Sequence, residues 1–106
     1  MSKSFSYDLS VAGSPSEAQA RLREVVTQQL RQSAKMHLTS EDSNSLAFRP
    51  QWGFPLVATV ARLIRGEGVK LSFSAGDGGT LVAVSGKVGA ERVASREFWA
   101  ETLGAT

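Results

Sequence analysis

The first apolar residues of the chain alternate with polar ones, and this spacing predicts a β-strand. The apolar positions recur at every second residue and would share one face: Phe5, Tyr7, Leu9 and Val11. A period of two is typical of a strand that buries one of its sides. Gly13 follows the pattern, and we expect the strand to end there.

A helix is predicted to begin after this glycine and to run to about Met36. Residues 14–17 read Ser-Pro-Ser-Glu, which supplies a capping serine, a proline at the first helical position and a glutamate three residues after the cap. The apolar residues that follow fall on one side of such a helix: Ala18, Leu22, Val25, Val26, Leu30 and Met36. This pattern indicates an amphipathic helix with its apolar face on a sheet.

Two polar side chains interrupt that apolar face. At about 100° per residue, Gln29 and Ser33 point near the middle of the stripe. One interpretation is that they bond to backbone or to buried water, or lie towards the edge of the stripe. The other is that they mark a polar spot in a cavity between the helix and the sheet.

The middle of the chain combines turn formers with one ambiguous apolar run. Residues 39–45 are polar and rich in turn formers, which predicts a loop, and residues 46–49 predict a short strand. Residues 56–65 are rich in β-branched side chains, as strands are, but they also match one helical face between a proline and a glycine. We interpret them as a strand, because residues 65–68 would form a tight turn into the next strand.

A glycine-rich loop between two alternating segments predicts a β-hairpin in the last third of the chain. Residues 76–79 read Gly-Asp-Gly-Gly and separate strands expected at 69–75 and 80–88. Residues 90–103 are predicted to be helical, with Gly104 as the C-cap.

Taken in order, these elements predict a single α+β domain over residues 1–106. The order is strand, helix, a meander of four strands and a C-terminal helix. Helices gathered on one face of an antiparallel β-sheet form a two-layer sandwich of helix on sheet. A curved sheet of this kind leaves room for a pocket between the layers.

Two segments carry a resemblance to a known group of domains. Phe5–Val11 followed by Gly13–Ala18 is similar to an opening strand that leads through a proline-containing turn into a first helix, and Gly76–Val84 is similar to a hairpin before a late strand. In this order they resemble the helix-grip superfamily, the START and Bet v 1-like domains. The resemblance implies apolar-ligand binding and, in some members, cyclase or hydrolytic chemistry, and it assigns no catalytic residue to this chain.

Composition limits the classes of protein to consider. The chain has 106 residues, 42% of them hydrophobic, a net charge of +2 and no cysteine. The absence of cysteine excludes disulfides and thiolate sites and is compatible with a reducing compartment. The first residues lack the apolar run of a signal peptide, and the apolar run Trp52–Ile64 is shorter than the ~20 residues that span a bilayer. We therefore expect a soluble, cytoplasmic protein without a membrane span.

No motif or spacing in the sequence supports a set of catalytic or metal-binding residues. His37 is the sole histidine and is interpreted as a helix-terminal side chain near the last carbonyls. The glycine-rich residues 76–79 lack the lysine and the serine or threonine of a phosphate loop. A surplus of two positive charges gives no reason to expect nucleic-acid binding. We therefore expect a non-enzymatic protein with no metal, no cofactor and no nucleic-acid partner.

Two bulky aromatic residues mark the candidate contact surface. Trp52 and Phe54 lie between Pro50 and Pro55 in an expected loop, where large apolar side chains are unusual unless they pack or bind. We interpret them either as a lid folded over the core or as a ligand gate or protein interface.

The sequence supports two functions from different classes. The first is a binding module that holds an apolar small molecule between the first helix and the sheet, with six lining residues: Gln29, Ser33, Phe48, Trp52, Phe54 and Trp99. The alternative is an interaction protein in which the segment Trp52–Ile64 forms a homodimer interface or a protein-partner interface.

Overall fold

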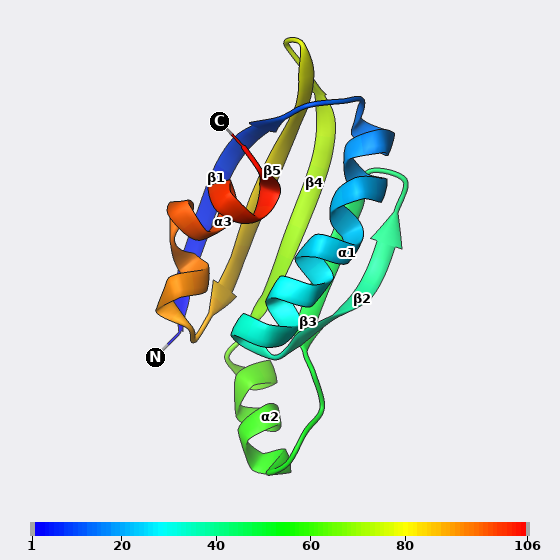
Figure 1. Cartoon of the computed structure of the whole chain (residues 1–106). Helices are drawn as coiled ribbons and strands as arrows, with labels where there is room; N and C mark the ends of the chain where they lie inside the picture. The colour runs from blue at the N-terminus through cyan, green and yellow to red at the C-terminus, as the bar shows by residue number, and fades with distance from the viewer. Residues whose placement is uncertain (1, 106) are drawn as a thin grey trace.

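A computed structural model describes residues 2–105 and contains one five-stranded antiparallel sheet with helices (Figure 1). In chain order the elements are β1 (Lys3–Val11), α1 (Pro15–Ala34), β2 (Met36–Asp42), β3 (Ser45–Pro50), α2 (Leu56–Ile64), β4 (Gly68–Gly76), β5 (Gly79–Val88), the 3-10 helix η1 (Glu91–Ala94) and α3 (Arg96–Leu103). The strands are hydrogen-bonded in the order β1-β5-β4-β3-β2. β1 and β2 are therefore the edges of the sheet.

Two helices, α1 and α3, lie against one face of this sheet (Figure 1). α1 contacts β2, β3, β4 and β5, and α3 contacts α1 and β1. The largest fully buried side chains come from both layers: Trp99, Phe48, Phe73, Leu30, Met36, Leu46 and Leu71. The predicted α+β class, with helices on one face of an antiparallel sheet, is confirmed.

Local sequence signals account for α1 and for the β4–β5 hairpin. The Glu17 N–H donates to Ser14 Oγ at 3.3 Å, so the predicted serine cap is formed. α1 ends slightly before Met36, where Lys35 adopts a left-handed conformation with φ 51°. In the turn of the hairpin Gly78 has φ 77°, a conformation that glycine adopts without steric cost.

The loop predicted at residues 39–45 was wrong, because most of that segment belongs to β2. This strand pairs antiparallel with β3, with a register shift between Leu38 and Ser40. It is an edge strand whose residues after Leu38 are exposed, so most of its positions have no need to be apolar. His37 consequently lies opposite Arg49 in this strand and not at a helix end as predicted.

The strand predicted at residues 56–65 was also wrong, because the segment forms helix α2. The Glu67 N–H donates to the Arg62 carbonyl at 3.1 Å, so the supposed hairpin turn is the C-terminal end of a helix. Gly66, with φ 76°, is the left-handed residue that ends it. The helical spacing and the terminal signals therefore outweighed the β-branched content.

The sheet keeps five strands because β2 takes the place of the missing one. The predicted four-strand meander is present as β2, β3, β4 and β5, which pair antiparallel in sequence order, and α2 lies in the connection between β3 and β4. β3 and β4 are neighbours, so this connection leaves and re-enters the sheet at the same end. As a result α2 projects from the end of the sheet (Figure 1).

The helix predicted at residues 90–103 is present in two pieces. η1 is followed by Ser95, whose Oγ accepts a hydrogen bond from the Phe98 N–H at 3.3 Å and caps α3. Gly104 ends α3 with φ 67°, as predicted for the C-cap.

Candidate functional site

Of the six predicted ligand-lining residues, Phe48 and Trp99 belong to the hydrophobic core. Both side chains have 0% of their surface exposed. The Trp99 ring stacks on Phe5 at a centroid distance of 5.9 Å, and its Nε1 donates to the Val93 carbonyl at 2.7 Å. Apolar side chains of α1 join the same cluster: Leu22, Val26 and Leu30. Core packing therefore occupies the region between α1 and the sheet in which a ligand was expected.

Gln29 and Ser33 lie on the side of α1 that faces the C-terminal helices η1 and α3. Arg92 Nη1 donates to Ser33 Oγ at 3.5 Å. Gln29 lines an open hollow of about 230 Å³ together with Arg92 of η1 and Phe98 of α3. This hollow is lined by residues of α1, η1 and α3 and by none of the sheet, so the ligand-binding role of Gln29 and Ser33 between α1 and the sheet stays a prediction.

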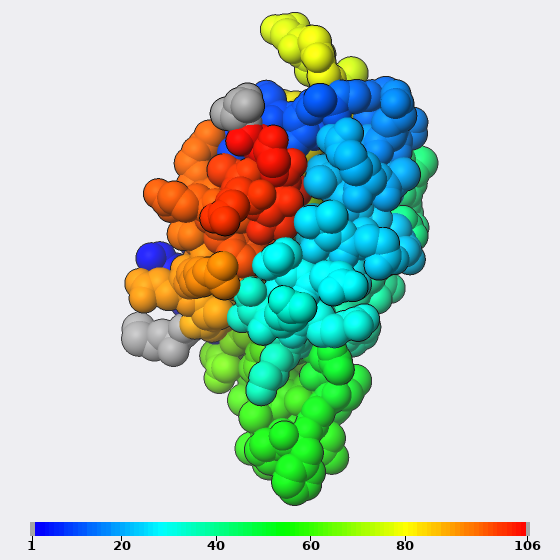
Figure 2. All heavy atoms as spheres, viewed as in Figure 1, coloured from blue at the N-terminus to red at the C-terminus, as the bar shows by residue number. Residues whose placement is uncertain are grey.

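Trp52 and Phe54 belong to residues 52–64, which comprise the end of the β3–α2 loop and α2 and which we call the apical segment. This segment forms the narrow end of the molecule, drawn in green in Figure 2. Its large apolar side chains are exposed: Trp52 60%, Phe54 98%, Leu56 58%, Val57 80%, Val60 42% and Ile64 80%. Among residues 2–105 only Val25 and Leu81 add further exposed large hydrophobic side chains. The exposed apolar surface is therefore concentrated in the apical segment.

α2 turns its apolar side away from the protein. At about 100° per residue its four exposed apolar side chains fall within roughly a third of the helix circumference: Leu56, Val57, Val60 and Ile64. Thr59, which lies outside this stripe, is buried at 6% exposure. An amphipathic helix normally packs its apolar stripe on the core, and an exposed stripe is typical of a surface that contacts another molecule.

A buried carboxylate ties α2 to the body of the protein. Glu67 is 1% exposed and accepts hydrogen bonds from Arg62 Nε at 2.9 Å, Arg65 Nη2 at 3.0 Å and Ser2 Oγ at 3.0 Å. Arg62 also donates through Nη2 to the Ala34 carbonyl at 2.6 Å, at the C-terminal end of α1. One carboxylate thus joins both ends of the last turn of α2 to α1 and to the start of the chain.

The electrostatics of this group favour its charged form. Burial acts to raise the pKa of Glu67, but the hydrogen bonds from Arg62, Arg65 and Ser2 outweigh it and hold the pKa below its usual value. The carboxylate is therefore ionised at neutral pH. The three groups together carry one net positive charge, two guanidinium groups against one carboxylate.

Basic side chains surround an open hollow at the base of α2. It has a volume of about 350 Å³ and is lined by Arg49 of β3, Lys70 of β4 and Lys87 of β5, with Gly66, Gly68 and Gly86 among the other lining residues.

The three basic side chains of this hollow lie on the face of the sheet opposite α1. Each is next along its strand to a buried residue, Phe48, Val69 or Val88, and neighbouring side chains of a strand point to opposite faces. The lining contains no carboxylate, and none of the ion pairs found within residues 2–105 uses these three cations.

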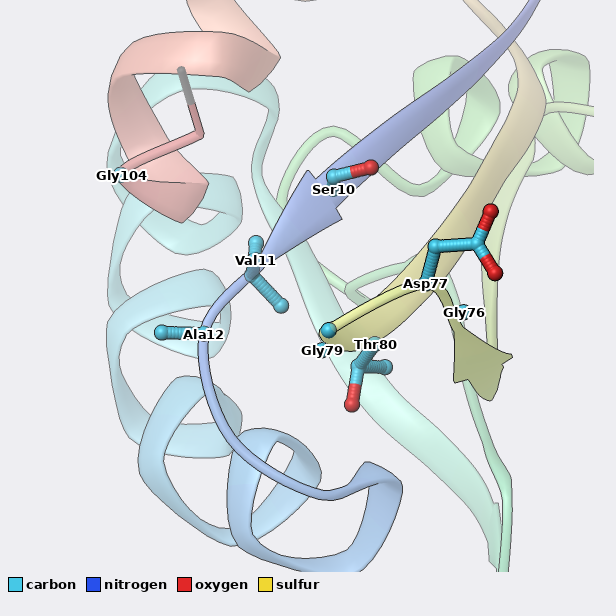
Figure 3. Close-up of a pocket in the computed structure, with 9 residues that line it drawn as sticks. Ser10, Val11, Ala12, Gly76, Asp77, Gly79, Thr80 and Gly104 are labelled. Atoms are coloured by element: carbon cyan, nitrogen blue, oxygen red, sulfur yellow. The ribbon is translucent and has the colours of Figure 1, made fainter.

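Figure 3 shows a different pocket at the opposite end of the molecule, between the end of β1 and the β4–β5 hairpin. It measures about 270 Å³, and Asp77 is the sole ionisable side chain among the described residues that line it. In the view, Asp77 points away from Val11 and Ala12. A general acid or base without a partner gives no catalytic arrangement.

The described part of the chain also gives no metal centre. Between residues 2 and 105 no group of three or more His, Cys, Asp or Glu side chains is placed to hold a metal ion. Over the same residues, no helix is both long and apolar enough to cross a membrane.

Comparisons with known proteins do not assign the chain to a family. No protein-family model and no curated protein sequence matches it. Among solved structures, the solution structure of the Aha1 dimer from Colwellia psychrerythraea is similar, with a TM-score of 0.49 and 8% sequence identity over 79% of this chain and 75% of that chain. We draw no functional argument from a similarity of this size, and the helix-grip resemblance stays a prediction.

Proposed function

We propose that this protein is a non-enzymatic binding module that acts by docking its apical segment onto an apolar surface of a partner. The observation that carries the proposal is the outward apolar stripe of α2 together with Trp52 and Phe54, all exposed. Of the two functions suggested by the sequence, this is the alternative one, with an exposed helix in place of the expected edge strand.

The energetics support docking through this segment. Burying a fully exposed Val, Leu, Ile or Phe side chain stabilises a complex by about 1.5–3 kcal/mol, and four such side chains here are more than half exposed: Phe54, Leu56, Val57 and Ile64. The clamp of Glu67 with Arg62 and Arg65 holds α2 in place before binding. A preorganised surface loses little conformational entropy on docking.

An apolar small molecule between α1 and the sheet is the weaker proposal. The residues predicted to line this site lie in separate places. Phe48 and Trp99 are in the core, and Trp52 and Phe54 are in the apical segment. Gln29 and Ser33, the intended polar contacts, lie toward the C-terminal helices.

Trp52 is a natural reporter for the docking test. The chain has two tryptophans, and Trp99 is already buried, so a change of emission on binding reports Trp52. We expect micelles of an uncharged detergent, the simplest apolar surface, to shift the emission to shorter wavelength. The double variant Val57→Ser with Ile64→Ser should bind at least tenfold more weakly, because two apolar side chains are removed from the contact.

The matched control is Leu81→Ser, an exposed apolar residue of β5 outside the apical segment. This variant should bind micelles as the unaltered chain does. Sedimentation of the unaltered chain without detergent determines whether a second copy covers the same surface. Equal micelle binding by all three proteins, or no binding together with a monomer at high concentration, would contradict the docking function.

A further inference from the structure

We propose that the surface onto which the apical segment docks is a bilayer containing anionic phospholipids. The inference rests on the proposed function and names the partner by its chemistry. It requires an apolar tip for the acyl region and cationic groups for the lipid phosphates, side by side on one end of the molecule.

The charged residues in and next to the apical segment are all positive. Residues 43–66 contain three charged side chains, Arg49, Arg62 and Arg65, and no Asp or Glu. The nearest carboxylate in the chain, Glu67, is 1% exposed and already paired with two of these arginines. The surface that accompanies the exposed apolar side chains is therefore cationic.

The basic hollow adds a place for a phosphate group. Gly66 and Gly68, which line it, directly follow α2 along the chain, so the hollow lies at the base of the projecting helix. The nine residues of α2 rise about 14 Å at 1.5 Å per residue. A tip that enters about 5–10 Å into the boundary between headgroups and acyl chains leaves Arg49, Lys70 and Lys87 at the level of the phosphates.

The unpaired cations of the hollow favour an anionic bilayer over a second copy of the chain. Arg49, Lys70 and Lys87 form no ion pair among the described residues, and a second copy carries the same net charge of +2, whereas like charges oppose association. Trp52 also suits a bilayer, because tryptophan is enriched where lipid headgroups meet the acyl region.

The remainder of the molecule supports an end-on orientation. The molecule extends 45 Å along its longest axis, and the apical segment forms one end (Figure 1). Three carboxylates and one cation lie toward the other end. Glu17, Asp42 and Asp77 are on the first turn of α1, the end of β2 and the β4–β5 turn, and Arg21 of α1 donates to the Ala12 carbonyl. An anionic surface would therefore attract the apical end and repel the opposite one.

The test measures binding of the full chain to phosphatidylcholine vesicles with and without phosphatidylserine, by co-sedimentation and by Trp52 emission. We expect at least tenfold tighter binding to the vesicles that contain phosphatidylserine, weakened by added salt. Lys70→Gln and Lys87→Gln should each weaken binding about fivefold. The matched control is Arg96→Gln, an exposed arginine on α3, which should change little. Circular dichroism confirms that each variant is folded.

The outcomes separate this inference from the proposed function. Equal affinity for both vesicle types, or no vesicle binding by a chain that binds uncharged micelles or forms a dimer through residues 52–64, overturns the lipid inference and leaves docking intact. Binding of inorganic phosphate at the hollow without vesicle binding also overturns it. Failure on vesicles, on micelles and in self-association overturns both proposals.

Discussion

Glu67 is the residue that fixes the position of α2. Its carboxylate accepts hydrogen bonds from Arg62, Arg65 and Ser2 in a site with 1% exposure. Breaking a buried ion pair by removing one partner costs about 3–5 kcal/mol, and here Arg62 keeps its bond to the Ala34 carbonyl. The sequence contained no signal for this cluster, because it depends on α2 ending where residues 65–67 can fold back.

Substituting Glu67→Gln should destabilise the protein by about 3 kcal/mol near neutral pH, because the charged partner of two arginines is lost. Glu41→Gln is the matched control: its pair with Arg23 is exposed, so we expect less than about 1 kcal/mol. Denaturant unfolding of the three proteins measures both values. Equal losses in the two variants would contradict the clamp.

The same carboxylate predicts a pH dependence of stability. The pKa of Glu67 is lowered in the folded protein, so its contribution is complete above the unfolded pKa of about 4.3. It is lost as pH falls through the folded pKa. Unfolding measured from pH 7 downwards should therefore show a steeper loss below about pH 4.3 in the unaltered chain than in Glu67→Gln. Parallel curves for the two proteins would contradict this assignment.

At the scale of elements, the sequence predicted correctly those helices and strands whose hydrophobic period and terminal residues indicate the same structure. β1, α1 and the β4–β5 hairpin combine a clear period with a cap or a glycine turn. β2 was missed because an exposed edge strand carries little hydrophobic pattern. α2 was misassigned because its apolar stripe faces solvent, and a stripe of β-branched residues then has the composition of a buried strand. The exposure of Trp52 and Phe54 could not be predicted for the same reason, because with residues 56–65 interpreted as a strand these two side chains were expected either to cover the core or to form a gate or interface.

The end of α2 gives a prediction about backbone conformation. Gly66 has φ 76°, and an added Cβ would meet nothing within 4 Å, so Gly66→Ala should lose about 1–2 kcal/mol through left-handed strain alone. The matched variant is Gly53→Ala, where φ is not positive and the closest neighbour of the added Cβ is the Gln51 carbonyl oxygen at 4.0 Å. We expect this change to be neutral or slightly stabilising by about 0.4–1 kcal/mol. Thermal unfolding compares them, and equal stability of the two variants would contradict the C-cap role of Gly66.

At the scale of the whole molecule, the two-layer body is a closed core and the apical segment is an addition to one end. Core packing fills the space between α1 and the sheet, while the exposed apolar side chains lie on the connection between two hairpins. The body thus acts as a support that presents α2 and the basic hollow together. Composition alone could not show this, because a net charge of +2 averages a cationic end with an acidic one.

The measurement that tests the central claim most directly is an amide NMR spectrum of the labelled chain, recorded with and without phosphatidylserine-containing bicelles. The account predicts that signal loss beyond the uniform effect of slower tumbling is confined to residues 52–66 and the strand residues around Arg49, Lys70 and Lys87. Contacts centred on Gln29 and Ser33, or spectra that do not change on adding the bicelles, would contradict the account.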